Sequence, residues 1–187
     1  CFIEQGGINL CRFASVDYGV SLSFSDITLQ NFGGGSFEKS GGVFGLSNVP
    51  GLTLNLIRCR ISGNMTNKEG GVFYVEGEGN DPVIYLNNVQ LIRNSSDSVG
   101  GVSAGGTNIW DQCYIAYNNS DSVGGVSGSG INTWLNSKLI ENYAGSSGGV
   151  ACIGTHTWTN CLISGNQAHL GGGVTDRGTH TWTNCIV

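Results

Sequence analysis

The chain of 187 residues has 32 glycines, 11% charged residues and a formal net charge of −5, whereas disordered chains are usually charge-rich and poor in aromatics. Its few lysines and arginines form no basic stripe, which argues against nucleic acid as a partner. No apolar run approaches the roughly 20 residues of a membrane helix, so we expect no membrane insertion.

Short alternating segments, each followed by polar turn residues, predict β-strands along the whole chain. Residues 20–24 and 84–86 alternate in this way, and alternation resumes after a polar corner at 89–91. We expect one domain, 1–187, with three parts. These are an irregular N-terminal part at 1–40, longer repeats at 41–99 and regular repeats at 100–187.

Internal repetition is the strongest signal in the sequence. Gly-Gly-Val recurs at 41–43, 70–72, 100–102, 124–126, 148–150 and 172–174, and the last three steps are 24 residues each. An asparagine stands six residues before five of these motifs, at Asn64, Asn94, Asn118, Asn142 and Asn166. A tryptophan follows four of them, at Trp110, Trp134, Trp158 and Trp182. Columns in phase to this extent predict a repeat array.

The composition of the repeats favours strands over helices. They are rich in Gly, Thr, Ser, Asn and Val, which are poor helix formers. A unit of about three short strands cannot bury a face alone, but units stacked on one another can. The sequence therefore predicts an all-β fold, a right-handed parallel β-helix of six to seven coils and roughly 30 Å in length at ~4.8 Å per coil.

The pairing of Gly-Gly-Val with Ile/Leu-x-x-Asn resembles the GGA[ILV] and FxxN repeats of chlamydial polymorphic outer-membrane proteins. Here Val replaces Ala, and Ile or Leu replaces Phe, as at Ile61 and Leu91. The resemblance covers about residues 20–187 and does not extend to the autotransporter barrel of that family. It implies a β-helix at a cell surface, used in adhesion or as a structural passenger.

The Trp and Asn columns each allow two interpretations. The Trp column is either an outward rail for sugar rings or an interior stack; we favour the stack because Leu56 and Leu86 occupy matching positions. The Asn column is interpreted as a hydrogen-bonded ladder at a corner, since Asn142 and Asn166 are not sequons. Three members do lie in glycosylation sequons, which leaves glycans possible at Asn64, Asn94 and Asn118.

The cysteines suggest contacts within and between copies. Cys161 and Cys185 share one column, where they form either a stack of thiols or a vertical disulfide; we favour thiols. Cys1 fits the same column, so the first and last repeats are in phase. This phase predicts head-to-tail stacking of copies, with Cys1 near Cys185 of the neighbour and a covalent link within reach. The alternative is that 1–187 is a fragment whose capping segments are left out.

Other polar columns give weaker signals. Asp97 and Asp121 share a column that we interpret as solvated rather than as a Ca²⁺ site. His156 and His180 share a column with asparagines, and no carboxylate lies in either stretch, so we interpret them as a simple polar column. We expect no metal, no cofactor and no catalytic site.

These observations together predict a structural role. We expect a subunit of an extracellular or cell-surface rod or fibre that assembles with copies of itself. The alternative is a cell-surface adhesin that binds glycans through an exposed strand face or through the longer N-terminal loops. A polysaccharide-degrading β-helix enzyme is disfavoured because the 13 acidic residues are scattered, whereas such sites need converging carboxylates.

Overall fold

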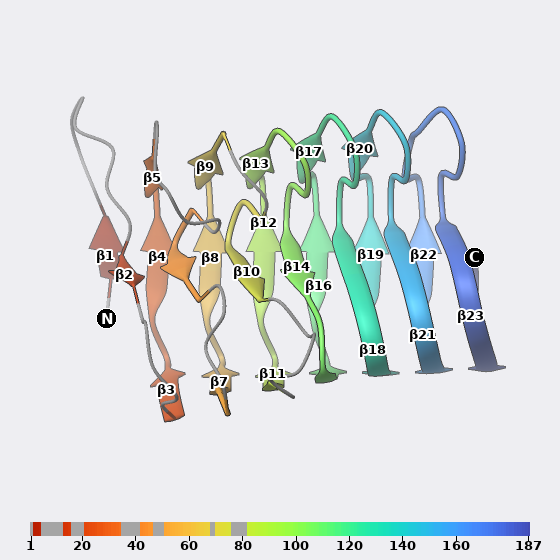
Figure 1. The fold of residues 1–187 in the computed structure, drawn as a ribbon, viewed down its shortest axis with the longest axis horizontal. Helices are drawn as coiled ribbons and strands as arrows, with labels where there is room; N and C mark the ends of the chain where they lie inside the picture. The colour runs from red at the N-terminus through yellow and green to blue at the C-terminus, as the bar shows by residue number, and fades with distance from the viewer. Residues whose placement is uncertain are drawn as a thin grey trace.

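The computed structural model describes residues 2–4, 13–15, 21–34, 42–46, 51–67, 70–75 and 82–187. All the elements in these ranges are β-strands, and every strand pairing is parallel. The strands follow one another along one long axis, from the N-terminal to the C-terminal repeat (Figure 1). Among the described residues, no helix is long and apolar enough to cross a membrane.

The repeats contribute strands to three sheets of the described structure, and the last repeat contributes only to sheet B. Sheet A contains β1 (Phe2–Glu4), β4 (Thr28–Gln30), β8 (Arg60–Ser62), β12 (Gln90–Ile92), β16 (Tyr114–Ala116), β19 (Lys138–Ile140) and β22 (Leu162–Ser164). Sheet C contains β5 (Gly33–Gly34), β9 (Met65–Thr66), β13 (Ser95–Ser96), β17 (Asn119–Ser120) and β20 (Tyr143–Ala144).

Sheet B is the largest and has two branches that merge. One branch contains β2 (Ala14–Ser15), β6 (Phe44–Gly45), β10 (Phe73–Val75) and β14 (Val102–Ala104). The other contains β3 (Ser21–Ser25), β7 (Thr53–Ile57), β11 (Val83–Asn87) and β15 (Thr107–Asp111). Both continue into β18 (Val126–Leu135), β21 (Val150–Thr159) and β23 (Val174–Thr183).

The strand register follows the sequence repeat. Val150 pairs with Val126 on one side and with Val174 on the other, each 24 positions away. The first described strand is in phase with the later repeats, because Ile3 pairs with Leu29, which in turn pairs with Ile61. Equivalent positions of successive repeats therefore lie directly above one another, which turns each sequence column into a column in space.

A column of glycines lets the two branches of sheet B join. Gly106, Gly130 and Gly154 have φ values of 78°, 86° and 128°, which L side chains rarely adopt. A Cβ atom at Gly154 would also collide with the carbonyl oxygen of Gly130 directly beside it. Glycine is therefore required where β18, β21 and β23 bend, and this bend directs side chains on both sides of it inwards.

The corners are built by residues in the left-handed backbone region. After the second branch of sheet B, one column has φ between 50° and 57°: Asp26, Arg58, Asn88, Gln112, Asn136, Asn160 and Asn184. After sheet A, a second column has φ between 52° and 66°: Asn31, Gly63, Arg93, Tyr117, Glu141 and Gly165. Asparagine and glycine tolerate this region best, which explains their frequency at these corners.

The interior is filled by the apolar members of the repeat. The Gly-Gly-Val valines of five repeats are fully buried, at Val43, Val72, Val102, Val126 and Val150. Beside them lie the buried members of the Ile/Leu-x-x-Asn motif, at Ile61, Leu91, Ile115, Leu139 and Ile163. Val174 is only partly buried, because β23 packs against a described strand on one side only.

Candidate functional site

The four tryptophans form a continuous stack in the interior. Adjacent indole rings have centroids 4.6, 4.7 and 4.8 Å apart and are within 8° of parallel. Three rings are fully buried, and Trp182 in the last repeat is 40% exposed. Such stacked pairs contribute roughly 0.5–1.5 kcal/mol each beyond burial. The column faces inwards and is therefore not a rail for sugar rings in the described structure.

The asparagine column forms a ladder in which the central rungs are saturated with hydrogen bonds. Asn118 Nδ2 donates to Asn142 Oδ1 at 2.9 Å and to the carbonyl oxygen of Leu91 at 3.0 Å. Its own Oδ1 accepts from the backbone N–H and from Nδ2 of Asn94, at 2.9 and 3.1 Å. The same pattern links Asn64 to Asn94 and Asn142 to Asn166. Each buried amide thus satisfies its donors and acceptor within the stack.

The ladder encloses the three asparagines that lie in glycosylation sequons. The side chains of Asn64, Asn94 and Asn118 have no exposed surface. A glycan on any of these nitrogens would need space that the neighbouring repeats occupy, and it would remove a hydrogen from the ladder. On the folded chain these three amide nitrogens are therefore enclosed by neighbouring repeats, and the ladder accounts for the recurrence of asparagine in this column.

The cysteine column is one of small buried side chains. Cys161 and Cys185 are thiols, and each donates to a carbonyl oxygen two residues earlier, at Thr159 and Thr183. Burial raises the pKa of the Cys161 thiol, and it raises the pKa of Cys113 to about 12. Cys1, the third member of the expected contact, lies outside the described residues.

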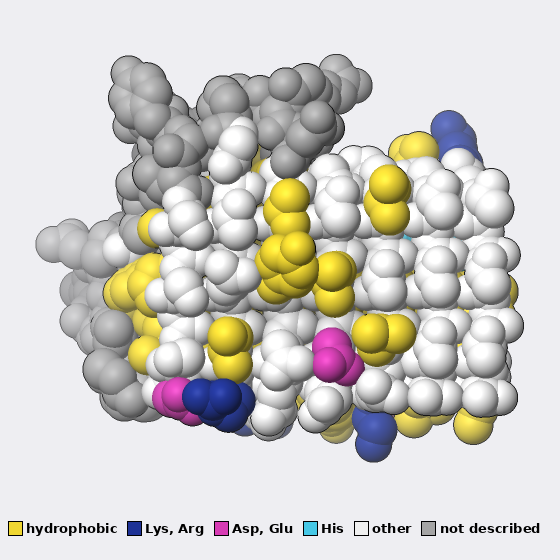
Figure 2. All heavy atoms as spheres, turned by 90° about the horizontal axis from the view of Figure 1, so that it is seen from below, with side chains coloured by type: hydrophobic (Ala, Val, Ile, Leu, Met, Phe, Trp, Pro, Cys, Tyr) yellow, Lys and Arg dark blue, Asp and Glu magenta, His cyan; other side chains and the backbone are white. Residues whose placement is uncertain are grey.

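Sheet B presents an outward face on which side chains also stack in columns (Figure 2). Apolar side chains gather near the middle of the face seen in Figure 2. Tyr85 and Ile131 are exposed and belong to adjacent outward columns of sheet B. Towards the C-terminal repeats the face is formed by threonines: Thr155, Thr157, Thr159, Thr179, Thr181 and Thr183. This face is regular and lacks converging charges among these residues.

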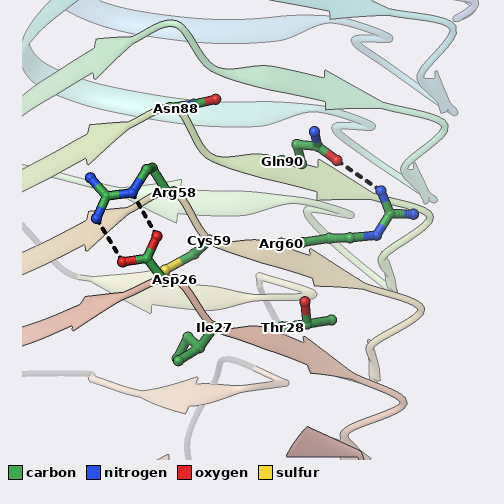
Figure 3. A pocket seen from close by; sticks show the side chains of 8 residues that line it. All are labelled: Asp26, Ile27, Thr28, Arg58, Cys59, Arg60, Asn88 and Gln90. Carbon is green, nitrogen blue, oxygen red and sulfur yellow. Dashed lines mark hydrogen bonds and ion pairs between the residues drawn. The ribbon is translucent and has the colours of Figure 1, made fainter. Parts of the chain in front are cut away.

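A shallow hollow of about 430 Å³ lies at the first corner, between sheets B and A (Figure 3). Arg58 donates to both carboxylate oxygens of Asp26 at 2.6 Å, and this holds the pKa of Asp26 below its usual value. Arg60 donates to Gln90 at 2.7 Å nearby. Along the hollow, Arg58 is thus paired with an opposite charge, whereas Arg60 is hydrogen-bonded to a neutral amide. An exposed ion pair such as Arg58–Asp26 contributes little to stability.

Sequence reasoning missed one residue in the histidine column. His156 and His180 stack with ring centroids 4.8 Å apart, as a shared column predicts. Cys152 lies beside them, and the ligand atoms of the three side chains are within 4.8 Å of one another. The sequence feature that could have indicated this contact is Gly154, where the strand bends and brings Cys152 and His156 together. In a straight strand, two residues four positions apart would not be in contact.

Comparison of the chain with models of protein families, with curated proteins and with solved structures gives no match. Function is therefore inferred from the geometry of the described residues alone.

Proposed function

We propose that the chain is a right-handed parallel β-helix that acts as a rigid structural rod at a cell surface or outside the cell, with copies stacked end to end. The observation that carries this proposal is the unbroken register of the Trp and Asn columns through successive repeats. Such columns couple each repeat to the next by stacking and by buried hydrogen bonds, which resists bending and local opening.

The interior supports a mechanical role over a binding one. Aromatic, aliphatic and amide side chains fill the space between the sheets, and the hollow in Figure 3 lies on the surface. In repeat arrays of this kind each repeat contacts only its neighbours, so further repeats extend the rod through the same contacts.

The C-terminal repeat offers a surface that suits end-to-end stacking. Trp182 continues the indole column and is 40% exposed, and Ile186 and Val187 are 69% and 68% exposed. The outer edge of β23 has no strand partner among the described residues. A repeat of a second copy placed on this edge would extend the sheets and cover the apolar side chains, in a contact that propagates rather than closes.

Sedimentation velocity over a range of concentrations tests this assembly, with electron microscopy of the largest species. We expect rods whose length grows with concentration, and Trp182→Asp should abolish growth because it places a charge in the apolar contact. Thr181→Asp is the matched control, since this neighbouring side chain points to the outward face; it should leave assembly intact. A chain that remains a monomer at every concentration, with native circular dichroism, would contradict the proposal.

The glycan-binding alternative is favoured by one surface feature. Tyr85 is 41% exposed on the outward face of sheet B, and Asn87 and Asp111 form a hydrogen bond nearby at 3.0 Å. An exposed aromatic ring beside amide and carboxylate groups is suited to stacking against a sugar ring. Glycan-array binding that is lost in Tyr85→Ala and retained in Tyr143→Ala, another exposed tyrosine, would support adhesion.

A further inference from the structure

Three metal-binding side chains converge inside the last two repeats. Cys152 and His156 come from β21 and His180 comes from β23. Cys152 is 2% exposed and His156 is 1% exposed, and His180 is half-buried. One ligand atom from each residue lies within 4.8 Å of the other two. Thiol sulfur and imidazole nitrogen are the ligands that zinc prefers in proteins.

The backbone bend creates this convergence. In a straight strand, residues four apart on one face are separated by roughly 13 Å, at about 3.3 Å per residue. Cys152 and His156 are four apart, but the bend at Gly154, with φ of 128°, brings their side chains together. Because a Cβ at Gly154 would collide with the Gly130 carbonyl, the backbone fixes the bend independently of any ligand.

The equivalent positions of earlier repeats hold different chemistry. Ala104 and Gly128 pair along the strand column that contains Cys152, and Asn108 and Asn132 pair along the column that contains His156. The Asn side chains there donate weakly to nearby backbone, as Asn108 Nδ2 does to Gly105 at 3.3 Å. In the earlier repeats a small residue and an asparagine occupy these two positions. In β21 both are replaced by residues that can bind a metal, Cys152 and His156.

We propose that Cys152, His156 and His180 bind a zinc ion that ties β21 to β23. Zinc bonds of about 2.3 Å to sulfur and about 2.0–2.1 Å to nitrogen place tetrahedral ligand atoms roughly 3.3–3.6 Å apart. The three side chains must therefore close by roughly 1 Å, and the two stacked imidazoles tilt towards the shared ion. Three protein ligands leave the fourth position of a tetrahedral zinc ion for water.

Binding also moves protons and changes a tryptophan contact. Cys152 coordinates as a thiolate, so its thiol proton passes to the buffer when zinc enters. Trp158 Nε1 donates to His180 Nδ1 at 3.2 Å, and His180 lies in ring contact with Trp182. Reorientation of His180 alters the surroundings of these indoles, so their fluorescence reports on occupancy.

The test uses the full chain without an affinity tag, treated with chelator and then titrated with Zn²⁺ by calorimetry. We expect one ion per chain, a measured heat that varies with the ionisation enthalpy of the buffer because protons are released, and a higher melting temperature. Co²⁺ serves as a spectroscopic probe, because a sulfur-to-cobalt charge-transfer band in the near ultraviolet appears only when a cysteine is a ligand.

The repeats themselves supply variants that should fold. Three variants each install the residue type of an earlier repeat: Cys152→Ala, His156→Asn and His180→Asn. Each should weaken zinc binding more than about 100-fold, which exceeds the loss expected when only a residue that hydrogen-bonds to a ligand is removed. Cys161→Ser and His169→Asn are matched controls, because Ser137 occupies the Cys161 column and His169 is exposed.

The controls should bind zinc as the unaltered chain does. Absence of binding at a tenfold excess of Zn²⁺ would overturn the proposal. So would retention of the cobalt–sulfur band in Cys152→Ala, or its loss in Cys161→Ser.

Discussion

At the scale of single residues, the buried amides are the most constrained side chains of the described structure. Each central rung donates both hydrogens and accepts twice, so no rung can be replaced without leaving a neighbour unsatisfied. Loss of one buried hydrogen-bond partner costs more than the bond itself contributes, because the remaining group has given up water.

Asn118→Ala should therefore lower the free energy of unfolding by about 1–3 kcal/mol for each group left unsatisfied. Asn119→Ala is the matched control, because this neighbouring side chain is exposed on β17. Urea denaturation followed by circular dichroism measures both variants. Equal midpoints for the two would show that the ladder does not contribute to stability.

A second residue-scale prediction concerns pH. Burial raises the pKa of Cys113 from 9.0 to about 12, so between these values the unfolded chain loses a proton that the folded chain retains. Because the unfolded state then binds fewer protons, stability falls as pH rises from 9 towards 12. Cys113→Val, which copies Val89 of the preceding repeat, should flatten this alkaline slope. Urea midpoints at pH 8 and pH 10.5 measure it, and an unchanged slope would contradict the assignment.

At the scale of elements, the corners decide where each strand ends and the next begins. Four asparagines occupy the left-handed column after sheet B, and exposed amides link the last three: Asn160 donates to Asn136 at 3.1 Å and Asn184 donates to Asn160 at 3.4 Å. Gln112 has a φ of 53° in the same column without the backbone tolerance of asparagine. The ends of the strands are thus built from a local backbone preference repeated in each unit.

Gln112→Asn should stabilise the chain by up to about 1 kcal/mol, because asparagine relieves part of the left-handed backbone cost. Gln167→Asn makes the same chemical change where φ is not positive, and we expect no gain there. Thermal unfolding of the two variants separates a corner effect from a general effect of shortening the side chain. A gain of equal size in both would exclude the backbone explanation.

At the scale of the whole molecule, stability depends on how many neighbours a repeat has. β18 pairs with strands on both sides, whereas β23 pairs with β21 alone among the described strands. Stacked repeats behave as a nearly one-dimensional array in which an end repeat lacks one interface. Within this chain, β23 should therefore open more readily than β18.

Amide hydrogen exchange should show this gradient, with slower exchange in β18 than in β23. The physical reason is that opening β23 breaks one interface, and opening β18 breaks two. Mass spectrometry of peptides from each strand measures it at protein concentrations below assembly. Added zinc should slow exchange in β23 and leave β10 unchanged, and uniform exchange along the stack would contradict the array description.

The sequence by itself determined the repeat, the corners and the identity of most interior columns. This was possible because stacking in register makes spatial neighbours out of residues at a fixed sequence spacing, so Trp110 and Trp134, or Asn118 and Asn142, are adjacent in both senses. Only the tertiary structure decided that the sequons at Asn64, Asn94 and Asn118 are fully buried, because burial depends on how the neighbouring repeats pack around the column. It also decided that Cys152 joins the histidines, because that contact depends on a backbone bend at Gly154 and has no period to reveal it.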